Sequence, residues 1–201
     1  ILQPTNLIEW PVKCINQVYI GSCMDKISAF SSFHLNAERI VQSQSIQQLW
    51  SRQLDILSGF GFDRALFVAA PLTNPGGWGD AQDRLVLTNY PPQVVDTFLH
   101  DGLHRTAAKV VQPAEGPGAY SWADPYQEEN TILSKDAQRH RKLCRDWEIR
   151  AGYTIWFSEM SSRRKAVMGL CARKGLSQTQ VDAIWVEDGR EIHTLCCLMH
   201  L

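Results

Sequence analysis

The first regular pattern of apolar residues in the chain predicts a helix over residues 36–58. Asn36 is the expected N-cap, because its side chain can accept a hydrogen bond from an unpaired backbone N–H, and Gly59 and Gly61 end the helix. The preceding residues 1–35 show no such pattern and are interpreted as an arm that packs on the core or on a partner. The apolar stripe of the helix is broken and consists of Ile40, Ile46, Leu49, Trp50, Leu54 and Leu57.

Short apolar runs between turn-rich segments predict the strands of the fold. FDRALFVAAP (residues 62–71) is typical of a buried strand, and RLVLTNY (residues 84–90) is typical of a second one. YTIWFSEM and KAVMGLCAR (residues 153–160 and 165–173) enclose a basic turn and therefore predict a hairpin. The glycine-rich segment that follows the first strand predicts a loop.

A short helix is predicted to follow the second strand. Pro91 and Pro92 favour its start, because proline is well tolerated in the first turn of a helix. Residues 112–122 are rich in glycine and proline and are predicted to form a loop that ends at Trp122. The apolar residues of the short helix are Val94, Val95, Phe98 and Leu99.

Two longer helices are predicted in the second half of the chain. Asp124 as N-cap and Pro125 as first helical residue announce one of them, with Gln127 placed for a capping box. Ser177 and Gln180 form a second capping-box pattern, which starts the last helix. The helical face of the first of these two helices consists of Leu133, Ala137, His140, Cys144 and Trp147.

This alternation of elements predicts an α/β/α sandwich. A central antiparallel sheet of about five strands would be covered by helices on both faces. The chain has 201 residues, 44% of them hydrophobic, which suits one compact domain. Its formal net charge of −1 provides no field that would attract nucleic acid, and no apolar run is long enough to cross a membrane. Six cysteines without paired spacing are interpreted as reduced thiols of a cytoplasmic protein.

No catalytic signature is present in the sequence. It contains no GxSxG, no phosphate-binding loop of the P-loop type, no HExxH and no paired CxxC. We therefore expect no enzyme, no catalytic residues and no cofactor.

Two groups of residues have the spacing of metal ligands. His193, Cys197 and His200 share one face of the last helix, and their donor atoms suit zinc. Packing of these side chains into a core or a dimer seam is the favoured interpretation, because a single helix seldom supplies a closed site. His100 and His104 form only a pair, which is too few ligands for tight binding. No metal site is predicted.

Aromatic residues on several elements indicate either a core or a pocket between sheet and helix. A pocket also needs a few polar groups within its apolar lining. The candidates for these groups are Tyr90, Trp122, His140, Thr154 and Cys171. The aromatic set itself consists of Phe62, Phe67, Tyr90, Phe98, Trp122, Trp147 and Trp156.

The order and spacing of several segments carry a resemblance to a known family. LSGFGFDRALFVAAP, LTNYPPQVVDTFLHDGL, YSW and AGYTIWFSEM…VMGLCARKG together resemble the autoinducer-binding domain of LuxR-type quorum-sensing transcription regulators, over residues 36–201. The resemblance implies an α/β/α sandwich that encloses an N-acyl homoserine lactone. It also implies a homodimer and a C-terminal helix-turn-helix domain that binds DNA, expected outside this chain.

The resemblance also implies which residues line the ligand site. Tyr90 matches the pocket tyrosine of the family, and Trp122 matches a tryptophan at the lactone end of the ligand. The expected site, including positions where this chain departs from the family, is Leu66, Tyr90, Val94, Phe98, Ala107, Trp122, His140, Cys144, Ile149, Thr154 and Cys171.

Four positions depart from the family pattern. Val94 replaces a tryptophan that donates to the lactone carbonyl, and Ala107-Ala108 replaces an Asp-Pro pair whose carboxylate accepts from the ligand amide. A buried amide without its acceptor costs ~1–3 kcal/mol, which weakens binding about tenfold for each ~1.4 kcal/mol. Glu148 replaces a glycine at the end of the long helix, and Trp156 replaces a proline in the next strand, where it can fill space used by an acyl chain.

Three hypotheses for function follow from these observations. The first is the sensing domain of an atypical LuxR-type regulator, which binds another small ligand or folds without one. The second is a conventional lactone receptor, in which Thr154 or His140 takes over the ligand amide. The third is an interaction protein that forms heterodimers with a full-length regulator and blocks it.

Overall fold

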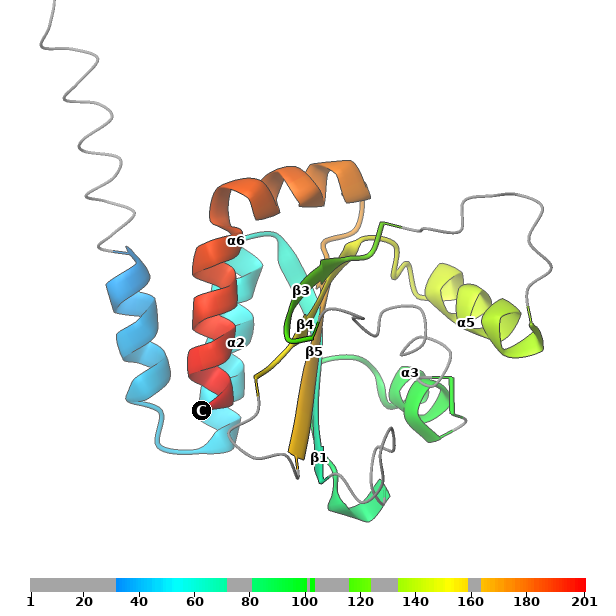
Figure 1. Cartoon of the computed structure of the whole chain (residues 1–201), viewed down its shortest axis with the longest axis horizontal. Helices are drawn as coiled ribbons and strands as arrows, with labels where there is room; N and C mark the ends of the chain where they lie inside the picture. Colours follow the sequence, from blue (N-terminus) through cyan, green and yellow to red (C-terminus); the bar gives the residue numbers. More distant parts are fainter. Residues whose placement is uncertain (1–31, 72–80, 101, 104–115, 124–133, 159–163) are drawn as a thin grey trace, which may run out of the picture.

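The computed structural model describes residues 32–71, 81–100, 102–103, 116–123, 134–158 and 164–201. Figure 1 shows a five-stranded sheet with α2 and α6 on one side and α3 and α5 on the other, so the predicted α/β/α sandwich is confirmed. Within these residues, no helix combines the length and apolar character needed to cross a bilayer. The helices are residues 32–41, α2 (Ile46–Gly59), the short turn η1 (Ala81–Asp83), α3 (Pro92–Val95) with the π-helical turn η2 (Asp96–His100), α5 (Lys135–Asp146) and α6 (Gln178–His200).

The sheet is antiparallel throughout, with the strand order β2-β1-β5-β4-β3. Its two longest strands, β1 and β5, lie side by side and pair over almost their whole length. Successive side chains along each strand point to opposite faces, so each strand contributes to two different layers. The strands are β1 (Phe62–Pro71), β2 (Leu85–Thr88), β3 (Gly118–Ser121), β4 (Gly152–Trp156) and β5 (Arg164–Ala172).

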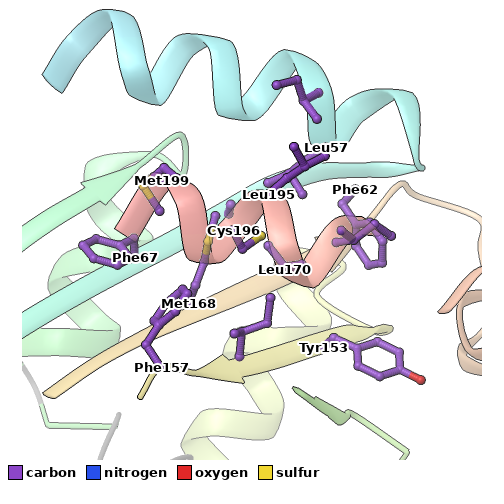
Figure 2. Close-up of a cluster of buried hydrophobic side chains, with 14 of the residues drawn as sticks. Leu57, Phe62, Phe67, Tyr153, Phe157, Met168, Leu170, Leu195, Cys196 and Met199 are labelled. Carbon is purple, nitrogen blue, oxygen red and sulfur yellow. The ribbon is translucent and has the colours of Figure 1, made fainter. Parts of the chain in front are cut away.

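One face of the sheet packs against α2, α6 and the helix over residues 32–41. Figure 2 shows Leu195, Cys196 and Met199 of α6 among sheet side chains such as Met168 and Leu170. Each buried side chain of this kind stabilises the fold by about 1.5–3 kcal/mol relative to an exposed one. This layer is the main apolar core of the domain.

The opposite face of the sheet holds the remaining buried apolar side chains. They come from β1, β5, α3, α5 and the segment after η2, and they are Val68, Ala70, Val94, Leu103, Leu143 and Cys171. The sheet therefore separates two layers of different size. It also separates the predicted aromatic set, because Phe62 and Phe67 belong to the main core, whereas Tyr90, Phe98 and Trp122 lie on the other side. The seven aromatic residues therefore do not form one cluster, and both interpretations, core and pocket side of the sheet, apply to different members of the set.

Several predicted elements are confirmed by the structure. β1 covers the predicted residues 62–71, and β4 and β5 form the predicted antiparallel hairpin pair. The capping box of α6 is present, with the Ser177 side chain accepting from the backbone of Gln180.

The prediction of one helix over residues 36–58 is wrong. The first helix already includes residue 32 and ends at residue 41, so Asn36 is inside it. A new helix, α2, then begins after Ser45, whose hydroxyl accepts from the Gln48 N–H at 3.1 Å. The break explains why the apolar stripe is irregular, because it belongs to two helices with different axes.

The prediction of a loop over residues 112–122 is also wrong in part, because Gly118–Ser121 form strand β3. The strand is short and contains no β-branched residue, and its pairing with β4 stabilises it. The predicted start of the long helix at Asp124 lies outside the described residues. The described helix α5 follows Ser134, which caps it by accepting from the Ala137 N–H at 3.2 Å.

The helix α6 turns sharply near its middle in Figure 1. Gly189 is the middle residue of α6, and it is buried. Bends of this size arise at glycine and proline positions. The turn brings Trp185 onto Tyr153, with ring centroids 3.9 Å apart and planes 9° from parallel, and edge-on to Phe62.

We predict that Gly189→Ala destabilises the domain. An added Cβ would lie 2.6 Å from Cδ1 of Trp185, so the indole would have to leave its stack on Tyr153. The clash should lower the free energy of unfolding by about 1–3 kcal/mol, against a helix-propensity gain of about 1 kcal/mol. Gly59→Ala is the matched control, because no atom lies within 4 Å of its added Cβ. Denaturant unfolding of both variants checks this, and a Gly189→Ala protein as stable as the parent would contradict it.

Candidate ligand-binding face

The register of the sheet brings three predicted site residues onto one face. Leu66 is paired with Gly169, and Gly169 is paired with Thr154, so these residues form one row across three strands. Cys171 pairs with Gly152 in the adjacent row. Directly paired residues share a face of the sheet. We refer to this side, which α3 and α5 cover, as the ligand face.

Trp122 lies against the ligand face over two glycines. A Cβ built on Gly152 would be 2.7 Å from the indole carbon Cε3, and one built on Gly169 would be 3.6 Å from Cζ2. The indole therefore occupies space that side chains would fill elsewhere in a sheet. Its Nε1–H donates to Oγ1 of the buried Thr154 at 2.7 Å, which fixes the orientation of the ring.

The residues that directly precede Tyr90 fix its backbone to strand β1. Oγ1 of Thr88 donates to the Ala65 carbonyl at 2.9 Å and accepts from the Tyr90 N–H at 3.0 Å. The side chain of Asn89 bonds both the Ala65 N–H and the Asp63 carbonyl. Burial raises the pKa of the Tyr90 hydroxyl and of the Cys171 thiol. Both groups are therefore uncharged at neutral pH.

Helix α5 and the turn η2 contribute the next group of predicted residues. The rings of Phe98 and His140 have centroids 5.9 Å apart, and Nε2 of His140 lies 3.5 Å from Sγ of Cys144. Burial lowers the pKa of His140 and raises the pKa of Cys144 to about 11. The imidazole is therefore neutral and Cys144 is a thiol at neutral pH.

Arg64 fixes the end of α5 to the sheet. Its guanidinium donates to the Trp147 carbonyl at 2.9 Å and to the Ala172 carbonyl at 2.8 Å, and its Nε bonds Asp63 at 3.1 Å. Cations near the carbonyls of a helix C-terminus are favourable. This contact sets the position of His140 and Cys144, and sequence reasoning missed it. The available signal was the pair of charged residues, Asp63 and Arg64, inside the otherwise apolar strand FDRALFVAAP.

The C-terminus of α5 is a Schellman motif with an unusual residue. The Glu148 N–H donates to the Arg145 carbonyl at 3.2 Å, and the Ile149 N–H donates to the Cys144 carbonyl at 2.7 Å. Glu148 has a φ of 52°, in the left-handed region where glycine is favoured. Glu148, which replaces a glycine of the family pattern, therefore has a strained backbone conformation. Glu148 pairs with Lys174 at the surface.

The other predicted site residues differ in how far the structure places them. Val94 is only 4% exposed on α3 and presents no hydrogen-bonding group. Leu66 and Ile149 are half-buried. Ala107 lies outside the described residues.

The predicted helical face of α5 is correct only in part. Ala137 and His140 are half-buried, but Leu143 is the buried residue of the helix and Trp147 is 37% exposed. At the far end of α6, His200 stacks on Phe157 with centroids 4.4 Å apart. This is the packing role favoured over a metal site.

The polar groups of the ligand face are paired with one another. Within the described residues, three buried side-chain N or O atoms lack a hydrogen-bond partner, and they belong to Trp50, Gln53 and Glu191 of α2 and α6. None of them is on the ligand face. Arg64 is paired with Cys171 in the sheet, and its guanidinium is bonded to backbone carbonyls and to Asp63. The described side chains of this face therefore leave no buried charge unpaired.

A family model described as the autoinducer-binding domain matches residues 45–201. The chain belongs to the autoinducer-binding domain family. The resemblance noted from the sequence motifs is thereby confirmed. A comparison with curated protein sequences gives no match.

Solved autoinducer-binding domains share the fold at low sequence identity. CepR2 from Burkholderia cenocepacia, an N-acylhomoserine lactone-dependent LuxR-family transcription factor, has 11% identity and a TM-score of 0.59, over 85% of this chain and 96% of CepR2. SdiA in complex with octanoyl-rac-glycerol has 14% identity and a TM-score of 0.59, over 85% of this chain and 66% of SdiA. The LBD domain of VqsR from Pseudomonas aeruginosa has 11% identity and a TM-score of 0.55, over 84% and 95% of the two chains.

We predict that Thr154→Val destabilises this autoinducer-binding domain. Valine has the shape of threonine but cannot accept from Trp122, so the indole N–H loses its partner at a cost of about 1–3 kcal/mol. Thr154→Ser is the control, because it keeps the hydroxyl. Denaturant unfolding should rank Thr154→Val below Thr154→Ser, and equal stability of Thr154→Val and the parent would disprove the role of this bond.

We predict that Glu148→Gly stabilises the domain. Glycine adopts the left-handed conformation without the steric cost that a Cβ brings. The melting temperature should rise by about 2–4 °C, as expected for a gain of this kind in a chain of this size. Glu148→Ala should give no rise, because it removes the Lys174 contact but keeps the strain. Equal melting temperatures of the glycine and alanine variants would show that the backbone at this position is not strained.

Proposed function

We propose that this domain is the sensing part of an atypical LuxR-family transcription regulator, whose ligand is an uncharged amphiphile without an amide group. One observation carries the proposal. On the ligand face, Trp122 is bonded to Thr154, and the Tyr90 hydroxyl and the Cys171 thiol are both uncharged at neutral pH. Such a face binds chiefly through apolar contact and offers no ionic partner to a ligand.

The departures at the lactone anchors support the same conclusion. Val94 is buried and apolar where the family resemblance implies an indole donor, and Ala107 carries no carboxylate. A ligand amide N–H would then lack its acceptor, whereas an ester has no such donor to satisfy. SdiA, which shares the fold, is described in complex with octanoyl-rac-glycerol, an ester of this kind. The proposal extends that ligand chemistry to this chain.

The proposal includes the rest of a regulator of this family. The domain would form a homodimer in the cytoplasm and act on DNA through a C-terminal helix-turn-helix domain. A conventional lactone receptor is the competing function. His140 supports it, because its neutral ring can accept a hydrogen bond from a ligand amide.

We predict that 1-octanoyl glycerol stabilises the domain more than N-octanoyl homoserine lactone does, and that octanoate has no effect. A ligand that binds only the folded state at 100 times its Kd adds about 2.7 kcal/mol, which is roughly 5–10 °C in melting temperature. The measurement is thermal unfolding of protein from a host that makes no lactones, with each compound titrated. Octanoate is the charged control with the same acyl chain.

Two variants connect this response to the ligand face. Tyr90→Phe should reduce the glycerol-ester shift by about 1–6 °C without unfolding the protein, because a head group that binds the hydroxyl loses one hydrogen bond. Thr194→Val should leave it unchanged, because the hydroxyl it removes bonds the Arg190 carbonyl on α6. A lactone shift larger than the ester shift would establish the conventional receptor instead. No shift with any of the three compounds would contradict the proposed ligand class.

A further inference from the structure

Helix α6 begins beside the strand end that carries Trp122. Its first residue, Gln178, and Asp182 one turn later both reach across to β3 and β4. We call these two side chains, with Ser121, Tyr153 and the backbone of Gly152, the α6 clamp. The proposed function assigns no role to the clamp.

Gln178 binds the backbone of Gly152 like an additional strand. Its Oε1 accepts from the Gly152 N–H at 2.9 Å, and its Nε2 donates to the Gly152 carbonyl at 3.1 Å. The same Nε2 lies 2.9 Å from Oγ of Ser121 and 2.8 Å from Oδ1 of Asp182. An amide nitrogen has two hydrogens, so these three acceptors share them.

Asp182 closes the clamp from the next turn of the helix. Its Oδ1 accepts from Oγ of Ser121 at 2.8 Å and from the Tyr153 hydroxyl at 2.8 Å. Burial alone would raise the pKa of Asp182, but the bonds donated by Gln178, Ser121 and Tyr153 outweigh it and lower the pKa. The carboxylate is therefore ionised at neutral pH, and charged acceptors make the stronger hydrogen bonds.

The clamp and the ligand face share atoms. The Gly152 carbonyl that Gln178 binds also accepts from the backbone N–H of Trp122 at 3.0 Å. Ser121 precedes Trp122 directly, and successive residues of a strand face opposite sides, so α6 holds one residue while the ligand face holds the next. Trp122 cannot move far from Gly152 without changing the hydrogen bonds of α6.

The clamp is not needed to start the helix. Ser177 and Gln180 form the capping box of α6, and neither of them bonds to β3 or β4 in the interactions described above. Gln178 and Asp182 therefore serve a contact between layers rather than the end of the helix itself.

We infer that Gln178 and Asp182 are positioning residues, which hold Trp122 on the ligand face and transmit a change at that face to α6. The transmission of a signal rests on the proposed function. The mechanical coupling between Trp122 and α6 does not, and it can be tested without any ligand.

A double-mutant cycle tests the coupling. Thr154→Val alters the ligand-face contact of Trp122, and Gln178→Ala removes the clamp from the other side. We expect the two effects on the unfolding equilibrium constant to differ from their product by about threefold or more. Thr154→Val with Ser177→Ala is the control cycle, and these effects should multiply. The inference would be overturned if the effects multiplied in both cycles, or if both double variants deviated equally from the product of their single effects.

Amide hydrogen exchange of Trp122 provides a local readout of the clamp, and Ser177→Ala controls for loss of stability. Gln178→Ala should accelerate this exchange at least tenfold more than Ser177→Ala does. Asp182→Asn keeps an oxygen acceptor, so the Trp122 amide should exchange more slowly in this variant than in Asp182→Ala. Equal exchange rates in Gln178→Ala and Ser177→Ala would show that the clamp does not position Trp122. Both measurements are made without ligand, so they are independent of the glycerol-ester experiment.

Discussion

An indole ring can lie directly against the backbone of a β-sheet only where the underlying residues have no side chain. In this domain that condition is met at Gly152 and Gly169, and Trp122 fills the space above them. A Cβ at Gly152 would also lie 2.1 Å from the Leu170 carbonyl, so no other residue fits there without a shift of the strands. The backbone of the same glycine bonds Gln178 of α6. One glycine thus forms the floor of the ligand face with its open side and the contact with the last helix with its backbone.

The two faces of the sheet are held together by different forces. The face toward α2 and α6 is a continuous apolar cluster, which supplies most of the stability through burial. The ligand face depends more on directed bonds, such as those from Arg64 to the end of α5 and from Asn89 to β1. Because the main core does not include the ligand face, residues there can change without loss of the fold.

Local signals in the sequence predicted the elements that local forces stabilise. The apolar run of β1 and the capping box of α6 are examples. The misses depend on distant contacts: β3 exists because β4 pairs with it, and Arg64 matters because its acceptors lie on a helix end 83 residues away. The alternation along a strand also does not tell which of the two faces is the main core. The sequence alone therefore does not separate Phe67 in the main core from Phe98 on the other side. The family resemblance identified Tyr90 and Trp122, but their hydrogen-bond partners became known only from the structure.

The pairing of groups on the ligand face changes how a ligand of the proposed class gains affinity. A head group that binds the indole N–H of Trp122 has to replace Thr154. This replacement exchanges one hydrogen bond for another, so its net contribution is small. Affinity must then come from apolar area, at about 25 cal/mol per Å² removed from water. Among uncharged head groups that leave no buried donor unpaired, such a face distinguishes ligands by chain length and shape, and it rejects ions because burying an unpaired charge is costly.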